Sequence, residues 1–270
     1  MRLNKFISHN SKYSRREADR LIEEGEVKIN KKTTADFAYA VQDDDHIEVK
    51  GRALRAKKQG EVTIIVYNKP KGVLVTKKDD RGRATIYHKL PGRYRHFIPV
   101  GRLDFASEGI LLLTDSPEVA DTLMNSALPR TYNLKIDKPV TQVMVDAMKS
   151  GLSLTDASAG AHERSNIKGM DFAPFSHFEL RGESGRYTKL RVTITEGKNR
   201  ELRRFFAHFG ATVVDLKRVA FGDIELNNLP TNKTRYYTRR EYDALHEFLK
   251  KSKAAKNTTS STKKKSIKAF

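Results

Sequence analysis

The chain of 270 residues contains no cysteine and no tryptophan. Without cysteine it has no disulfide, no thiolate metal site, no iron–sulfur cluster and no thiol nucleophile. Its eight histidines are scattered singly, so the sequence suggests no metal site. No apolar run approaches the ~20 residues of a membrane span, and the first residues begin a folded pattern rather than a signal peptide. These absences favour a soluble, cytoplasmic protein that does not associate with membranes.

Positive charge is present in excess. Lysine and arginine number 52 against 33 acidic residues, which gives a formal net charge of +19 and predicts a polyanionic partner. Residues 250–270 hold eight lysines and no acidic residue, with almost no apolar content. We expect this segment to be a disordered tail. It is either a solubilising tail or an arm that adds salt-sensitive affinity for phosphates.

Residues 1–50 are predicted to form a small α/β module. The segment 14–17 reads SRRE, a capping box that opens a helix. Arg15 and Arg16 stand in the first turn of that helix, where the helix dipole disfavours cations. They are either two solvated arginines or part of a phosphate site. The basic, glycine-bounded stretch 51–60 is predicted to be a linker.

Residues 61–249 are predicted to form one strand-rich α+β domain. Runs of strands between isolated helices argue against a doubly wound nucleotide fold. The chain also lacks GxxxxGK[ST] and GxGxxG, so no nucleotide cofactor has an obvious site. A hairpin is expected across residues 182–185. Asn199 is expected to cap a helix with an apolar stripe that Gly210 ends.

An aspartate between two glycines is the first candidate for chemistry. Residues 101–114 read GRLDFASEGILLLT, in which Asp104 precedes an almost wholly apolar strand. Such a position holds a side chain rigidly near the edge of the core, a common setting for reacting groups. From the residues alone, Asp104 is either a reacting group or a structural residue that caps the turn or pairs with Arg102.

A cluster of cations is the second candidate. Residues 195–204 read TEGKNRELRR and place four cations at the start of the expected helix, again against the helix dipole: Lys198, Arg200, Arg203 and Arg204. This pattern favours an anion site over a solvated basic face. The anion is either a phosphate or a carboxylate such as that of Asp104.

Several motifs in order resemble a known family. GRLD with GILLLT, preceded by NKPKG at 68–72 and followed by RTY at 130–132 and EGKNRELRR, is similar to the RNA pseudouridine synthases of the RsuA/RluB group. Residues 1–50 resemble the RNA-binding module first described in ribosomal protein S-four. The resemblance covers residues 1–249. RGRAT at 81–85 and FGDI at 221–224 look closer to the members that act on large-subunit rRNA.

The resemblance implies a fold, a reaction and a set of residues. The fold is a small α/β RNA-binding module followed by a mixed, mainly antiparallel sheet. The reaction is the isomerisation of uridine to pseudouridine in ribosomal RNA, without cofactor or metal, by a chain expected to be monomeric. Asp104 matches the catalytic aspartate, Tyr132 the active-site tyrosine and Arg203 the arginine that pairs with the aspartate. Glu201 stands where much of the family has glutamine. The expected contacts to substrate and RNA are Arg102, Leu202, Lys198, Arg200, Arg204, Lys69, Lys71, Arg15 and Arg16.

These residue types suit the reaction. A carboxylate assists by attacking the anomeric carbon, by attacking carbon six of the ring, or by removing a proton to give a glycal. A neighbouring guanidinium favours the ionised carboxylate, and a tyrosine can stack on the base and handle its proton. A uridine in structured RNA has to be flipped out of the stack to reach them.

Other functions remain compatible with the sequence. The main rival is a non-catalytic rRNA-binding ribosome assembly factor in which Asp104 and Arg203 form a structural ion pair. A synthase that acts on small-subunit 16S rRNA is another. A glycosidase or nucleoside hydrolase is weaker, because those enzymes usually need a second catalytic carboxylate.

Overall fold

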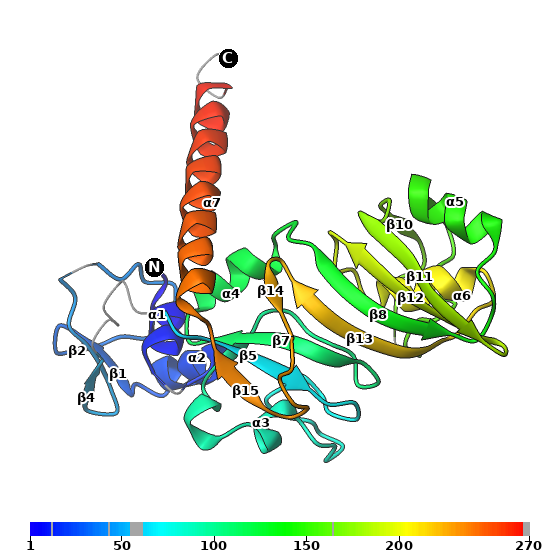
Figure 1. Cartoon of the computed structure of the whole chain (residues 1–270). Coiled ribbons are helices and arrows are strands. Elements are labelled where there is room, and N and C mark those ends of the chain that lie inside the picture. The colour runs from blue at the N-terminus through cyan, green and yellow to red at the C-terminus, as the bar shows by residue number, and fades with distance from the viewer. Residues whose placement is uncertain (12, 43, 55–61, 164, 267–270) are drawn as a thin grey trace. The chain divides into compact units, whose positions relative to one another are not determined.

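The computed structural model describes residues 1–11, 13–42, 44–54, 62–163 and 165–266 (Figure 1). The chain divides into two compact units, Met1–Thr63 and Ile64–Phe270, and each has its own core. Among the helices of these ranges, none is both long enough and apolar enough to cross a membrane.

The N-terminal unit is the predicted α/β module. Two helices pack on a sheet of order β2-β1-β3-β4. The capping box at Ser14 and Glu17 is present, and Ala18, Leu21 and Ile22 of the second helix are buried. The elements are α1 Leu3–Asn10, α2 Arg15–Glu23, β1 Val27–Ile29, β2 Lys32–Thr33, β3 Ile47–Val49 and β4 Arg52–Leu54.

The boundary predicted after residue 50 is wrong by one strand. Arg52–Leu54 pairs with Ile47–Val49, because Gly51 has a φ of +70° and allows a tight turn between the two strands. The expected linker at 51–60 therefore begins no earlier than residue 55. Its remaining residues lie outside the part of the chain that the structure describes.

The second unit is built on a nine-stranded sheet whose path is β11-β12-β8-β13-β7-β5-β15, with β14 on β13 and β6 on β7. Among the described strand pairs of this sheet, only β13 with β7 is parallel. The predicted mixed, mainly antiparallel α+β fold is confirmed. The strands are β5 Ile64–Lys69, β6 Ile98–Pro99, β7 Glu108–Thr114, β8 Arg130–Ile136, β11 His177–Ser184, β12 Tyr187–Ile194, β13 Val213–Phe221, β14 Ile224–Glu225 and β15 Thr234–Tyr236.

Helices and a small second sheet cover the large one. Figure 1 shows α5 and α6 at the end of the sheet that β8, β11 and β12 form. Buried side chains of α5, α6 and β10 join those of β8 and β12 in one core. These elements are α3 Ile86–Lys89, η1 Gly92–Tyr94, α4 Pro117–Met124, α5 Gln142–Ser150, β9 Leu152–Leu154, β10 Met170–Phe172, α6 Glu201–His208 and α7 Arg239–Ser266.

Burial follows the pattern that the sequence predicts in the central strands. Residues 64–67 of β5 and β7 from Gly109 onward are buried, as expected of apolar runs, and β5 continues through Asn68 and Lys69, which are also buried. The hairpin is also present, but its turn is shifted. Ser184 pairs with Tyr187, and Gly182 lies at a register shift inside β11 rather than in the turn.

The start of α6 differs from the prediction. The helix begins at Glu201, and the residue before it is Arg200 in a left-handed conformation (φ +52°) without a side-chain cap. Asn199 therefore does not cap the helix; its carbonyl oxygen accepts from Arg204 instead. The predicted apolar stripe is correct, since Leu202, Phe205 and Phe206 are buried.

The structure contradicts the disorder expected from residue 250 onward. Helix α7 continues from Arg239 to Ser266. Its sequence contains no glycine or proline, and lysine and alanine favour helix at several of its positions. Residues 267–270 lie outside the described chain.

Candidate active site

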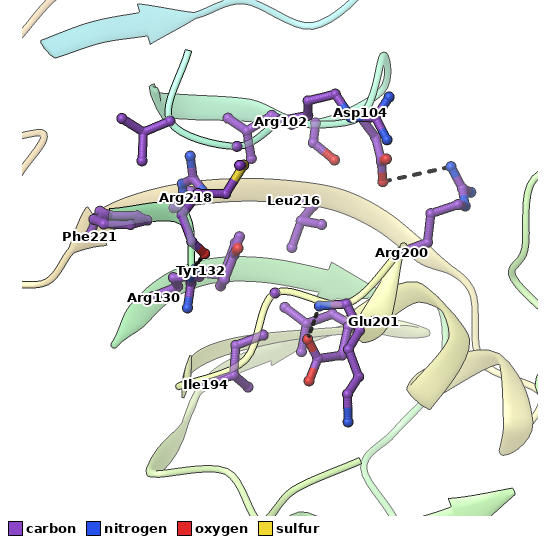
Figure 2. A pocket seen from close by; sticks show the side chains of 18 residues that line it. Arg102, Asp104, Arg130, Tyr132, Ile194, Arg200, Glu201, Leu216, Arg218 and Phe221 are labelled. Carbon is purple, nitrogen blue, oxygen red and sulfur yellow. Dashed lines mark hydrogen bonds and ion pairs between the residues drawn. The ribbon is translucent and has the colours of Figure 1, made fainter. Parts of the chain in front are cut away.

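A pocket of about 120 Å³ lies between the loop before β7, strands β8 and β13, and the start of α6 (Figure 2). Tyr132 and Leu202 form part of its apolar wall, and Asp104, in the loop before β7, contributes a carboxylate. Its lining residues are Val100, Gly101, Arg102, Leu103, Asp104, Ser107, Met124, Arg130, Tyr132, Ile194, Gly197, Lys198, Arg200, Glu201, Leu202, Leu216, Arg218 and Phe221.

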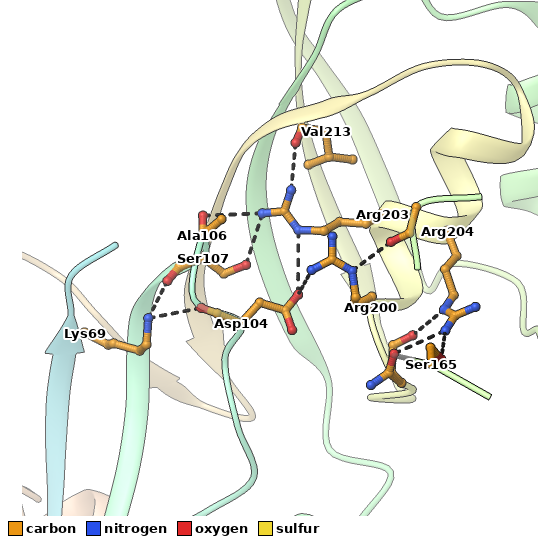
Figure 3. A network of polar contacts seen from close by, with 11 residues as sticks. Lys69, Asp104, Ala106, Ser107, Ser165, Arg200, Arg203, Arg204 and Val213 are labelled. Atoms are coloured by element: carbon orange, nitrogen blue, oxygen red, sulfur yellow. Dashed lines mark hydrogen bonds and ion pairs between the residues drawn. The ribbon is translucent and has the colours of Figure 1, made fainter. Parts of the chain in front are cut away.

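Two arginines hold the Asp104 carboxylate (Figure 3). Arg203 Nε lies 3.6 Å and Arg200 Nη1 3.7 Å from its Oδ2 atom. The Asp104 side chain is 32% exposed, so the carboxylate is both held and accessible from the pocket. The predicted pairing of Asp104 with Arg203 is confirmed, and Arg200 is a second partner.

Arg203 connects three parts of the fold. Its guanidinium donates to the carbonyl oxygens of Val213 at 2.8 Å and Ala106 at 3.3 Å, and to the Ser107 hydroxyl at 3.3 Å. Burial and the nearby Arg200 charge lower the pKa of Arg203, and the Asp104 carboxylate opposes this shift. An arginine remains charged under such conditions. Arg203 therefore fixes the Asp104 loop against α6 and β13.

Lys69 stabilises the same loop by hydrogen bonds to its backbone. It is fully buried, and its ammonium donates to the carbonyl oxygens of Pro70 at 3.0 Å, Asp104 at 3.1 Å and Ser107 at 2.8 Å. Burial lowers its pKa to about 8, although the charges of Asp104 and Glu108 oppose the shift. The predicted contact of Lys69 with RNA is wrong, because the side chain faces the interior.

Arg204 is likewise an interior residue. The predicted contact of Arg204 with RNA is therefore wrong. Its side chain is fully buried and donates to the Asn199, Ala157 and Ile167 carbonyl oxygens and to the Ser165 hydroxyl. The position of Arg204 on α6 turns it toward the 157–167 loop rather than toward the pocket. Arg204 thus anchors that loop to the helix.

The other predicted cations are more accessible. Lys71 pairs with Asp215, with 43% of its side chain exposed. Lys198 pairs with Glu196 at 2.8 Å and lines the pocket, as does Arg102. Arg15 and Arg16 are exposed in the first turn of α2, in the N-terminal unit.

Leu202 is both a core residue and a pocket residue. It is 3% exposed, belongs to the main apolar core and still lines the pocket. The adjacent Glu201 is also buried, and its Oε2 atom accepts from the Lys198 backbone N–H at 2.8 Å. Burial raises the pKa of the Glu201 carboxyl.

Sequence reasoning missed two arginines in the pocket. Arg130 belongs to the RTY motif, but only Tyr132 of that motif was assigned to the site, and Arg218 was not singled out. Both are buried and line the pocket. A signal was available for Arg218, because Leu216, Arg218 and Ala220 occupy alternating, inward positions of one strand.

Comparison with known proteins identifies the family of this chain. The family model described as RNA pseudouridylate synthase matches residues 63–208, and the S4 domain model matches residues 1–47. An uncharacterized RNA pseudouridine synthase of Helicobacter pylori is 49% identical over 92% of this chain and 95% of its own. The ribosomal large subunit pseudouridine synthase B of Bacillus subtilis is 31% identical over 90% of this chain and 95% of its own. A crystal structure of a pseudouridylate synthase covers 91% of this chain and 99% of its own, with 25% identity and a TM-score of 0.57.

Proposed function

Because this chain belongs to the RNA pseudouridylate synthase family, we propose that it isomerises a uridine of large-subunit ribosomal RNA to pseudouridine. The Bacillus subtilis relative, a large-subunit enzyme by name, supports the choice of RNA. The observation that carries the proposal is the Asp104 carboxylate, held by two guanidinium groups at the side of a pocket that Tyr132 and Leu202 also line.

The reaction breaks the bond between ribose C1′ and ring N1 and forms one between C1′ and ring C5. C5 loses its proton and N1 gains one, so substrate and product are isomers. Asp104 assists by attacking C1′, by attacking ring carbon six, or by removing a ribose proton. In each case an oriented carboxylate is needed, and Arg200 and Arg203 hold that of Asp104 in place.

The surrounding residues take the remaining roles in the proposal. Tyr132 stacks on the base and handles the proton at C5, and Leu202 packs against the ring. Arg102 holds the flipped nucleotide, while Lys71, Lys198 and Arg200 bind the flanking phosphates. Arg15 and Arg16, in the S4 domain, also bind RNA. The protein acts as a cytoplasmic monomer.

The Asp104→Asn variant tests the catalytic assignment. It keeps the shape of the side chain but removes its charge, so we expect at least a 10³-fold loss of pseudouridine formation. RNA affinity and thermal stability should stay close to those of the wild type. Asp146→Asn, an exposed aspartate on α5 outside the pocket, is the matched control and should retain activity.

Pseudouridine formation by Asp104→Asn at the wild-type rate would reject the assignment. A wild-type chain that binds rRNA but forms no product would favour the assembly-factor alternative. The substrate is identified by mapping pseudouridines in rRNA from cells that lack this gene. We expect one site to be missing from the large-subunit rRNA, and a loss confined to 16S rRNA would contradict that part of the proposal.

A further inference from the structure

Two buried arginines stand on neighbouring strands at one side of the pocket. Arg130 at the start of β8 is 5% exposed and Arg218 on β13 is 4% exposed. Their guanidinium carbons lie 5.0 Å and 5.4 Å from the centre of the Phe221 ring. Figure 2 shows this group on the opposite side of the pocket from Asp104 and Arg200.

Their positive charge is not balanced by a paired carboxylate. Among the lining residues, Asp104 pairs with Arg200 and Arg203, and Lys198 pairs with Glu196. Within the described residues, neither Arg130 nor Arg218 has a carboxylate oxygen within 4.0 Å of its guanidinium nitrogens. Burial and the Arg218 charge lower the pKa of Arg130, and the Tyr132 and Glu201 side chains oppose this shift.

The two arginines differ in their hydrogen bonds. Arg130 donates to four backbone carbonyl oxygens, those of Met124, Ser126, Leu128 and Thr195. Arg218 donates through Nε to the Ile110 carbonyl oxygen at 2.9 Å. Its buried Nη2 atom has no hydrogen-bond partner among the residues that the structure describes. Arg130 is therefore fixed by the fold, while Arg218, a lining residue of the pocket, keeps one buried guanidinium nitrogen without an acceptor.

A buried, charged donor without an acceptor is costly to the folded protein. Buried polar groups in native structures generally have a partner, and exceptions call for an explanation. Here Arg218 lines the pocket that takes the substrate. An oxygen atom of the bound substrate that carries negative charge would supply the missing acceptor.

We propose that Arg218 donates a hydrogen bond to a carbonyl oxygen of the extruded uracil, and that Arg218 and Arg130 together stabilise the negative charge that the base acquires during the reaction. This inference rests on the proposed function. When the C1′–N1 bond breaks, its electron pair stays on N1 and spreads to the O2 and O4 atoms of the ring. The electron-deficient ribose carbon is left to the side of the pocket that holds Asp104.

The assignment holds for each route available to Asp104. Attack on C1′ and formation of a glycal both release the base as an anion. Attack on ring carbon six instead moves an electron pair through the ring to O4. In every case negative charge develops on a carbonyl oxygen, and preorganised donors in a site with little water are most effective against such charge. Arg218 is then a catalytic residue, and Arg130 acts through the field of its charge.

Single-turnover kinetics on the rRNA transcript that the wild type modifies test this role. We expect Arg218→Met to lower the rate constant about 10²–10³-fold, as the loss of one oxyanion-hole donor does, with RNA affinity within threefold of the wild type. Arg218→Lys keeps the charge and should lose about tenfold. Arg191→Met, on β12 and outside the pocket lining, is the matched control and should stay within twofold.

A transcript that contains 5-fluorouridine separates charge stabilisation from a structural role. Fluorine withdraws electrons and makes the base a better leaving group, so its departure depends less on Arg218. We expect the loss caused by Arg218→Met, measured as consumption of the target nucleoside, to be at least tenfold smaller on this transcript. Thermal unfolding monitors folding, and Arg218→Lys takes the place of Arg218→Met in this comparison if the methionine variant does not fold.

An equal loss on both transcripts would overturn the inference, because a distorted pocket slows both to the same extent. Wild-type activity in Arg218→Met would overturn it as well. In both cases the proposed function would stand, since the wild type would still form pseudouridine. A wild type that modifies no rRNA would instead reject the proposed function and this inference with it.

Discussion

Lys69 and Arg203 approach the loop of Asp104 from different elements, and both donate to its backbone or to Ser107. Lys69 donates to the Asp104 and Ser107 carbonyl oxygens, and Arg203 to the Ala106 carbonyl oxygen and the Ser107 hydroxyl. The orientation of the carboxylate therefore depends on two buried cations, of which one can lose its charge and the other cannot. The pKa of Lys69 is about 8, so only Lys69 loses its charge in an accessible pH range.

We expect the Lys69→Met variant to be about tenfold less active than the wild type at pH 7, because three carbonyl oxygens lose their charged donor. The ratio of wild-type to variant activity should shrink as pH rises through about 8, where the wild type itself becomes neutral at this position. Single-turnover rates between about pH 6.5 and 9.5 measure the ratio. Lys149→Met, an exposed change on α5, is the control, and a constant ratio for Lys69→Met would contradict the prediction.

The contribution of Lys69 to the stability of the fold should rise with pH, whereas the ratio of wild-type to variant activity should shrink. The pKa of Lys69 in the folded chain, about 8, is below its ordinary value of 10.5. Between these values the unfolded chain binds more protons than the folded one, so this group's contribution to stability rises with pH. Below about pH 8 the full cost of burying the charge is present.

Residue types and their order predicted part of the site. The cations after residue 197 indicated an anion site, and Arg203 and Arg200 do hold the Asp104 carboxylate. The same pattern did not reveal that Arg204 faces the other way. Its acceptors include backbone oxygens of residues 157 and 167, which lie about forty positions earlier in the chain. Backbone acceptors of this kind leave no trace in side-chain patterns.

At the scale of elements, the parallel pairing of β7 with β13 brings the two sides of the pocket together. Gly109 pairs with Arg218 in this register. Gly109 has a φ of +104°, and a Cβ atom there would lie 2.1 Å from the Arg218 carbonyl oxygen. The close approach of the two strands therefore requires glycine at this position.

We expect Gly109→Ala to lower the free energy of unfolding by about 3 kcal/mol or more, from backbone strain and the clash between strands. Activity should fall as well, because the clash displaces Arg218. Urea unfolding and single-turnover rates measure the two effects. Gly92→Ala is the matched control, since a Cβ at Gly92 meets nothing within 4 Å. A Gly109→Ala variant as stable as the control would be incompatible with this packing.

The individual strands were easier to predict than their arrangement. The apolar run of β7 and the alternation of β8 are visible in the sequence and match the observed burial. The parallel neighbour of β7 is not visible, because β13 lies about a hundred residues later and its pattern fits either direction. The family resemblance, rather than periodicity, supplied the expectation of a mixed sheet.

At the scale of the whole molecule, the lysines after residue 249 are concentrated at one end of the chain. Residues 250–270 contain eight lysines and no acidic residue, and α7 extends through Ser266. A positively charged segment of this length attracts RNA phosphates without regard to sequence.

We expect deletion of residues 251–270 to weaken RNA binding and to make the dependence of the binding constant on salt concentration less steep. The modified uridine should not change, because the pocket is intact. Binding titrations between about 50 and 200 mM salt measure the slope. A full-length variant with glutamine in place of these lysines separates charge from length, and an unchanged slope in both proteins would contradict the prediction.

The pairing of β7 with β13 also affects the stage of synthesis at which the protein becomes able to modify RNA. Arg218 donates to the carbonyl oxygen of Ile110, 108 positions earlier in the chain. Contacts between such distant segments form late, since a long loop has to close first. A nascent chain that has only its S4 domain and β7 outside the ribosome could bind RNA but could not yet modify it. Modification would begin only after β13 has emerged during translation and joined the sheet.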